Sequence, residues 1–275
     1  MKQYVERHRS QALAASNGRL ASVLDAPFLS VVIPAYNEEA RIGRTLQQMV
    51  EYLNGQTYSW EMIVVSDGSK DRTEEIVNEF ASGKPNVRLI SYNPNRGKGN
   101  AVRVGMLAAK GDRVLFMDAD LATPPEETAK VMQHMDQGAD VAIGSRPLKE
   151  SKLEKHQPLY REAFGRMSNV IVQAVGVRGI KDTQCGFKLF THKASRGIFS
   201  RLKMAGFSFD MEALMIARDL GYRIDEIPIR WSDQEGSKVV LWRDAPKVLR
   251  DLFAMRLMGR KRRLQVRDDA KSNGA

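Results

Sequence analysis

Several residue types that mark common protein classes are scarce in this sequence. Its single cysteine, Cys185, cannot form an internal disulfide, which is typical of a reducing compartment. Its four histidines are scattered, with neither metal-ligand nor catalytic-triad spacing, and no Gly-x-Ser-x-Gly or Walker A motif is present. These absences disfavour nucleophilic hydrolases, zinc sites and P-loop nucleotide hydrolases.

Long apolar runs are also missing. The best one, residues 170–177, is far shorter than the roughly 18 residues of a transmembrane helix. The N-terminal residues contain no apolar segment of the kind that a signal peptide requires. We therefore expect neither a transmembrane helix nor a signal peptide.

Positive charge, in contrast, is in excess. The formal net charge is +10, and residues 243–275 hold ten Lys or Arg against four Asp or Glu. Such an excess favours anionic partners, namely nucleic acid, phosphorylated substrates or an anionic membrane surface. The alternative is a solvated charged tail. With 43% hydrophobic and 28% charged residues, the composition is otherwise that of an ordinary globular protein.

Strand-like and helix-like segments alternate through the first half of the chain. Near-continuous apolar strands of this kind predict a mostly parallel, Rossmann-like α/β sheet with helices on both faces. We expect strands at residues 28–35, 60–66, 86–92, 113–118 and 139–145, and helices at 39–53, 73–80, 99–109 and after Pro124 and Pro125.

The second half is less regular and adds amphipathic helices. The pattern indicates a charged loop at 146–157, a short strand after residue 187, a helix at 210–220 and a strand at 223–231. The helices at 158–177 and near 244–258, the latter basic, either lie on a membrane surface or pack on the sheet. We interpret the chain as an N-terminal extension (1–27), one catalytic domain (28–242), and a basic amphipathic helix and tail (243–275).

Polar residues and glycines gather where the predicted strands end. Ligands of such sheets bind outside the carboxyl ends of the strands. Asp118 and Asp120 follow one strand and can share Mg²⁺ or Mn²⁺, although a solvated turn is the alternative. Asp67, beside Gly68, either accepts a hydrogen bond from a base or ribose or forms a plain turn. Lys98 opens a helix, where it can hold an anion.

Several of these motifs resemble the inverting family 2 glycosyltransferases of GT-A fold. The matching motifs are residues 31–39, 67–71, 97–99 and 118–120. In the second half, the run Asp-Thr-Gln-Cys-Gly-Phe-Lys-Leu-Phe at 182–190 is similar to the branch of that family that glucosylates dolichyl phosphate. Residues 144–146, 209–212, 231 and 236–238 resemble the same branch. The dolichyl-phosphate mannosyltransferases share this layout.

The resemblance implies transfer of a hexose, most simply glucose, from a UDP-sugar to dolichyl or another polyprenyl phosphate, with inversion at the anomeric carbon. It also assigns a role to each matching residue. The donor would be bound by Pro34, Tyr36, Glu38, Asp67, Lys98 and Asp118, the metal by Asp118 and Asp120, and the acceptor phosphate by Arg146, Arg161 and Lys238. We further expect Asp182 and Asp210 to join Asp118 and Asp120 as catalytic residues by orienting acceptor or sugar hydroxyls; the alternative is that each is a buried structural acid.

Three features depart from the resemblance. The eukaryotic members carry an N-terminal membrane helix that we do not expect here, Ser66 replaces a frequent Asp, and Leu121 replaces a usual Gly, which leaves the sugar open. Because a polyprenyl tail stays in the bilayer, we expect a cytoplasmic protein that binds peripherally to the cytoplasmic face of a membrane. We expect no nucleic-acid partner, since the basic excess lies in a tail poor in aromatics. The alternatives are a glycosyl- or nucleotidyltransferase with a soluble acceptor, a non-catalytic sugar-nucleotide binder, and a basic nucleic-acid-binding protein.

Overall fold

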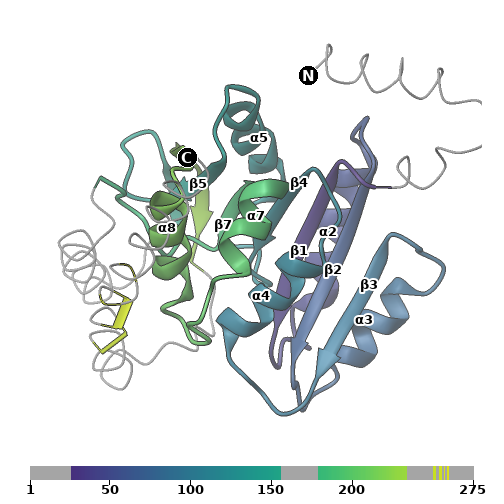
Figure 1. Cartoon of the computed structure of the whole chain (residues 1–275). Coiled ribbons are helices and arrows are strands. Elements are labelled where there is room, and N and C mark those ends of the chain that lie inside the picture. Colours follow the sequence, from purple (N-terminus) through teal and green to yellow (C-terminus); the bar gives the residue numbers. More distant parts are fainter. Residues whose placement is uncertain are drawn as a thin grey trace, which may run out of the picture.

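A seven-stranded sheet of order β3-β2-β1-β4-β7-β5-β8 forms the centre of the molecule (Figure 1). The computed structural model describes residues 26–155 and 179–233, together with residues 250, 251, 254, 255, 257 and 259. The strands are β1 (Leu29–Ala35), β2 (Trp60–Asp67), β3 (Val87–Tyr92), β4 (Arg113–Met117), β5 (Val141–Ser145), β6 (Lys152–Lys155), β7 (Phe187–Thr191), β8 (Ile224–Pro228) and β9 (Arg230–Ser232). The helices are α2 (Ile42–Asn54), α3 (Thr73–Ala81), α4 (Lys98–Ala108), the 3₁₀ turn η1 (Pro125–Glu127), α5 (Thr128–Asp136), α7 (His192–Phe199) and α8 (Phe209–Asp219).

The strand order places a topological switch point between β1 and β4. From β1 the chain builds outward through β2 to β3 and then returns to add β4 on the other side of β1, with all of these pairs parallel. At such a point the loops after the two central strands separate and leave room for a ligand. Those loops begin after Ala35 and Met117, the ends of β1 and β4.

Helices cover both faces of the sheet, so that its strands are buried on both sides. Val32 packs in one core with α4, α7 and α8, whereas Val31 and Ile33 pack in the other with α2, α3 and α5. In Figure 1, α4, α7 and α8 lie on the same side of the sheet. This arrangement explains the near-continuous apolar runs of the strands and confirms the predicted mostly parallel α/β fold.

The second half of the chain differs in detail from its prediction. β7 runs antiparallel to both β4 and β5. The predicted strand at 223–231 is two strands, because β8 ends at Pro228, which has no N–H to donate, and β9 pairs with β6 in a separate two-stranded sheet. β6 also lies in the predicted loop at 146–157. Sequence reasoning missed α7, whose start is capped by Thr191 accepting from the Ala194 N–H at 3.1 Å.

Several predicted segments fall outside the residues that the structure describes. They are residues 1–25 of the N-terminal extension, the helix at 158–177, and most of the tail at 243–275. The predicted domain limits therefore stay predictions. Among the described residues, no helix has the length and apolar character to cross a membrane.

Candidate active site

The loops after β1 and β2 are fastened to each other by hydrogen bonds. Asn37, with a positive φ of 52°, donates its N–H to Ser69 Oγ at 3.1 Å and accepts from the Lys70 N–H at 2.8 Å. Glu38 donates its N–H to Thr73 Oγ1 at 2.8 Å. The predicted donor-binding residues of these loops are thus held in one fixed frame at the switch point.

Asp67 fixes the loop that leads into α4. The residue is 2% exposed, and its two carboxylate oxygens accept the N–H groups of Arg96 and Gly97, each at 2.8 Å. Gly97 has a φ of 98°, a conformation that L residues rarely adopt. Asp67 therefore has a structural task at the start of α4, and its contact with a nucleotide stays a prediction.

Lys98, the first residue of α4, reaches the end of β4. Its Nζ lies 2.7 Å from Asp118 Oδ1, and the two side chains are 27% and 29% exposed. Burial lowers the pKa of Lys98, but Asp118, Asp210 and Asp120 outweigh that effect, so the pKa is raised overall. Lys98 is therefore a fixed cation beside the carboxylates that end β4.

The Asp118–Asp120 segment is positioned by residues from two other parts of the chain. The Asp118 N–H donates to the Gly186 carbonyl at 3.0 Å, and Thr45 Oγ1 donates to the Ala119 carbonyl at 2.6 Å. A Cβ atom at residue 186 would lie 2.0 Å from Asp118 Oδ2, so only glycine allows this approach. Leu121 follows with a φ of 55°.

The donor set at Asp118 and Asp120 fits a divalent cation. Asp118 Oδ1 is buried and, apart from its ion pair with Lys98, has no hydrogen-bond partner in the described part of the chain. Burial, and then the negative charge of Asp118, raise the pKa of Asp120. A cation between the carboxylates would relieve that repulsion. Among the described residues no cluster of three or more His, Cys, Asp or Glu is formed, so water and phosphate would complete the coordination.

A second lysine–aspartate pair, Lys188 and Asp210, lies near the same aromatic ring as the first. Lys188 of β7, 1% exposed, donates to Asp210 at the start of α8 and to the Cys185 carbonyl. Burial raises the pKa of Asp210, although Lys188 and Lys98 act in the opposite direction. The Nζ atoms of Lys98 and Lys188 each lie 5.7 Å from the centre of the Phe116 ring.

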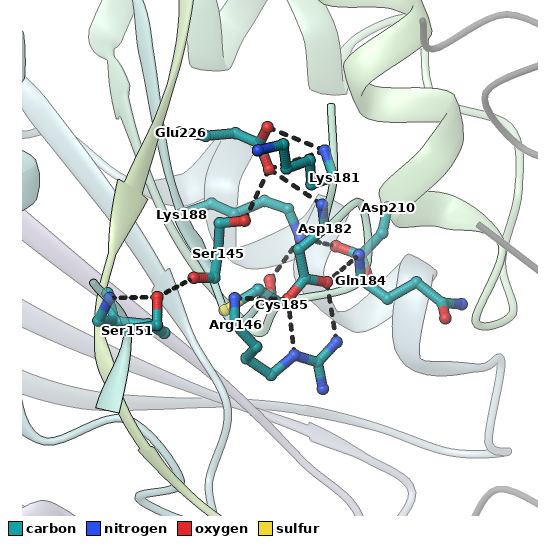
Figure 2. Close-up of polar contacts among 11 residues, drawn as sticks. Ser145, Arg146, Ser151, Lys181, Asp182, Gln184, Cys185, Lys188, Asp210 and Glu226 are labelled. Carbon is teal, nitrogen blue, oxygen red and sulfur yellow. Dashed lines mark hydrogen bonds and ion pairs between the residues drawn. The ribbon is translucent and has the colours of Figure 1, made fainter. Parts of the chain in front are cut away.

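Arg146 and Asp182 form a two-pronged ion pair after β5 (Figure 2). Arg146 Nε and Nη2 donate to the Asp182 carboxylate at 2.6 and 2.8 Å, and the Arg146 N–H donates to it at 3.1 Å. The Arg146 guanidinium lies 5.3 Å from the Trp231 ring centre. Burial acts to raise the pKa of Asp182, but the charge and hydrogen bonds of Arg146 outweigh burial, so the pKa of Asp182 is lowered. Burial acts to lower the pKa of Arg146, but Asp182, with a smaller contribution from Asp118, outweighs burial, so the pKa of Arg146 is raised.

The structure thus gathers most of the predicted site residues at one edge of the sheet. Pro34 is buried at the end of β1, Tyr36 follows it, and Glu38 pairs with Arg41. Arg161 and Lys238 lie outside the described residues.

Sequence reasoning missed three charged residues. The pKa of Arg41 is raised, mainly by its hydrogen bond with Glu38, although burial acts in the opposite direction. The negative charges of Glu38, Asp120 and Asp118 raise it further. Glu226 accepts hydrogen bonds around Asp182. Lys188 was part of the 182–190 run, where a lysine inside an apolar strand is the signal that could have identified it.

Comparison with protein families and curated proteins gives consistent matches. The family model "Glycosyl transferase family 2" matches residues 30–199. A dolichyl-phosphate beta-glucosyltransferase of Trichomonas vaginalis is 39% identical over 232 residues, which cover 79% of this chain and 70% of that protein. The dolichyl-phosphate beta-glucosyltransferase of Homo sapiens is 36% identical over 253 residues, which cover 86% and 78% of the two chains.

Solved structures share the fold at lower sequence identity. A glucosyl-3-phosphoglycerate synthase from Mycobacterium tuberculosis, crystallised with Mn²⁺, UDP-glucose and phosphoglyceric acid, superposes with a TM-score of 0.62 and 20% identity. The match covers 88% of this chain and 82% of that one. At this identity the likeness establishes the architecture only.

Proposed function

This chain belongs to glycosyl transferase family 2, and we propose that it transfers glucose from UDP-glucose to dolichyl phosphate or a related polyprenyl phosphate. The observation that carries the proposal is 34–39% identity, over most of both chains, to relatives named for that activity. The site agrees with it, because carboxylates, lysines and an arginine meet at the switch point, where a nucleotide-sugar and a second phosphate must be held together.

The reaction is a single displacement with inversion. An oxygen of the acceptor phosphate forms a bond to the anomeric carbon of glucose while the bond from that carbon to UDP breaks, and UDP leaves with the bonding electrons. A phosphate monoester has a second pKa of about 6, so the nucleophile is already ionised at pH 7 and needs no general base. The protein must therefore orient two anions and stabilise charge on UDP.

The donor side of the site is formed by the loops after β1 and β2 and the start of α4. We assign Pro34, Tyr36, Glu38 and Asp67 to the uracil and ribose, and Lys98 with Asp118 to the diphosphate and its metal. The hydrogen bonds that join these loops support the assignment, since they fix the loops after β1 and β2 and the start of α4 relative to one another. A preorganised donor pocket of this kind lowers the entropic cost of binding UDP-glucose.

Asp118 and Asp120 would hold Mg²⁺ or Mn²⁺. When bound, such a cation supplies Lewis-acid stabilisation of the charge that develops on UDP. The support is the pair of oxygen-donor carboxylates, in which the buried Asp118 Oδ1 has Lys98 as its partner and Asp120 has a raised pKa. The Mn²⁺ ion in the M. tuberculosis enzyme of the same fold is consistent with it. Lys98 would share the same charge from the protein side.

The acceptor side is centred on Arg146. Its guanidinium is fixed by Asp182, and 28% of the side chain is exposed, so it can present a planar pair of donors to a phosphate. Arg161 and Lys238 would assist it. Asp182 and Asp210 would act through the cations that they hold, Arg146 and Lys188.

The acceptor also determines where the enzyme works. A polyprenyl tail stays in the bilayer, so the protein must come to the cytoplasmic face of the membrane. The +6 charge of residues 243–275 would attract it to anionic lipids, at roughly 1 kcal/mol per Lys or Arg near the surface. Removing residues 260–275, which hold six of these cations, should reduce sedimentation with anionic vesicles at low salt and spare turnover of a detergent-solubilised acceptor.

A direct assay tests the proposed function. The full chain is incubated with dolichyl phosphate in detergent, Mg²⁺ or Mn²⁺, and UDP-glucose, UDP-galactose or GDP-mannose in turn, and the lipid product is identified by mass spectrometry. We expect glucosyl phosphoryl dolichol from UDP-glucose, loss of the product in EDTA, and recovery with either metal. The absence of any glycosylated lipid would contradict the proposed acceptor, and a lipid product formed only from another donor would contradict the proposed sugar.

A further inference from the structure

Glu226 of β8 is surrounded by hydrogen-bond donors from two other segments (Figure 2). Its Oε1 accepts from Ser145 Oγ at 2.7 Å and from the Asp182 N–H at 2.9 Å. The Lys181 N–H donates to both oxygens, at 2.9 and 2.8 Å. One carboxylate thus fastens the end of β5 to the segment that follows residue 180.

The two fastened segments are those that carry the Arg146–Asp182 pair. Ser145, fully buried, directly precedes Arg146, and Asp182 itself donates its N–H to Glu226. Ser151 Oγ adds a further restraint by donating to the Ser145 carbonyl at 2.6 Å. Because β5 and β8 are paired neighbours, with Ile143 opposite Glu226, the carboxylate has a rigid base.

We infer that Glu226 is a positioning residue for acceptor binding, acting through Asp182 on Arg146. This inference rests on the proposed function, because it takes Arg146 as the group that binds the acceptor phosphate. Asp182 occupies the Nε–Nη2 edge of the guanidinium, so a phosphate would bind the remaining Nη1–Nη2 edge, and two-point binding there requires that the side chain be held in one orientation. Asp182 holds that orientation, and Glu226 holds the backbone of Asp182.

The geometry also argues against a chemical task for Glu226. Its two oxygens already accept four hydrogen bonds from three groups, all of them within the protein. A carboxylate used in this way stabilises the backbone that it contacts. Removing the Glu226 carboxylate should therefore weaken binding of the acceptor phosphate, which we assign to Arg146, and should leave the affinity for UDP unchanged.

The test is a double-mutant cycle of Glu226→Gln and Arg146→Ala in the full chain. Glutamine keeps the size and one acceptor oxygen but turns an NH₂ group toward backbone donors. The probe is farnesyl phosphate, with affinity measured by calorimetry alongside the affinity for UDP. We expect Glu226→Gln to weaken farnesyl phosphate binding about tenfold, with UDP affinity unchanged, and to add nothing further in the Arg146→Ala background.

Two further variants keep the test decisive. Asp225→Asn, on the same strand, removes a partner of His134 and Arg223 and should leave both affinities unchanged. If Glu226→Gln does not fold, Ser145→Ala removes one donor and leaves the carboxylate its backbone N–H donors, and it should give a smaller effect that also vanishes with Arg146→Ala.

The outcomes separate the inference from the proposed function. If Arg146→Ala weakens farnesyl phosphate binding but Glu226→Gln and Ser145→Ala do not, the inference is wrong and the proposed function stands. Effects that add in the double variant, or that fall equally on UDP, would overturn it as well, since they indicate a general structural role. A wild-type chain that binds no farnesyl phosphate would overturn the proposed function and the inference with it.

Discussion

Two lysine–aspartate pairs stand near one aromatic ring, and they differ in burial. Lys98 and Lys188 each place Nζ 5.7 Å from the Phe116 ring centre. The Lys188–Asp210 pair is 1% and 7% exposed, whereas the Lys98–Asp118 pair is 27% and 29% exposed. A buried pair cannot exchange partners without leaving a charge in an apolar surrounding, but a partly exposed pair can. We therefore interpret the Lys188–Asp210 pair as fixing β7 to α8 and the Lys98–Asp118 pair as available to substrate.

The sharpest way to break this comparison is to remove the buried lysine. Lys188→Met leaves Asp210 buried without its cation and should lower the free energy of unfolding by about 3–5 kcal/mol, measured by urea denaturation. Lys98→Met is the matched variant and should cost about 1 kcal/mol or less. Equal destabilisation by the two variants would contradict the distinction. Adding Asp210→Leu to Lys188→Met should restore most of the loss, because an apolar pair of similar volume needs no partner.

The converse prediction concerns the exposed pair. Asp118→Asn should reduce the rate of glucose transfer by at least about two orders of magnitude, because the neutral side chain no longer supports the metal charge that stabilises UDP. The thermal midpoint should change little, since the aspartate is partly exposed. Turnover within about threefold of wild type, measured with dolichyl phosphate in detergent, would remove Asp118 from the metal site.

A steric change sharpens the role of Asp118 without altering its charge. Gly186→Ala would bring a methyl group to 2.0 Å from Asp118 Oδ2, so the carboxylate must move. We expect kcat to fall about tenfold or more, since small displacements of reacting groups are costly. Gly206→Ala is the control, because a Cβ there meets no atom within 4 Å. If both variants keep wild-type kcat, the position of Asp118 is not critical.

The smallest effect extends the comparison to the third ion pair, Arg146–Asp182. The pKa of Asp182 is lowered on folding, so between that value and about 3.9 the unfolded state binds more protons than the folded state. The stability that Asp182 contributes is therefore present above about pH 4 and is lost as the pH falls through the lowered pKa. In urea unfolding as a function of pH, the difference between wild type and Asp182→Asn should shrink in this acidic range. A difference that stays constant would contradict the lowered pKa.

The part of the candidate site that we propose binds the donor could be located in the sequence because its signals are local. Asp67, Lys98 and Asp118 each stand where a strand ends or a helix begins, and parallel strands bring such positions to one edge of the sheet. Periodicity therefore located the elements and the positions at which they end. The same reasoning gave the mostly parallel sheet with helices on both faces.

The part that we propose binds the acceptor depends on contacts between residues far apart in the sequence. Arg146 donates to Asp182, 36 positions away, and Ser145 donates to Glu226, 81 positions away. No local pattern announces such pairs, and the antiparallel direction of β7 cannot be read from its apolar residues. Pro228 was visible as a strand breaker, yet only the structure shows that the chain then enters a second sheet.

The central place of β7 has a consequence for the order in which the molecule assembles. β7 lies between β4 and β5 although it follows both in the chain, so the sheet stays divided until residues 187–191 have been synthesised. The pairing of the parallel strands β1 to β4 needs only residues that precede β7 in the chain. We therefore expect a nascent chain to pair strands β1 to β4 first and to expose the open edge of β4 until β7 has been synthesised. During that interval the chain most needs protection from aggregation.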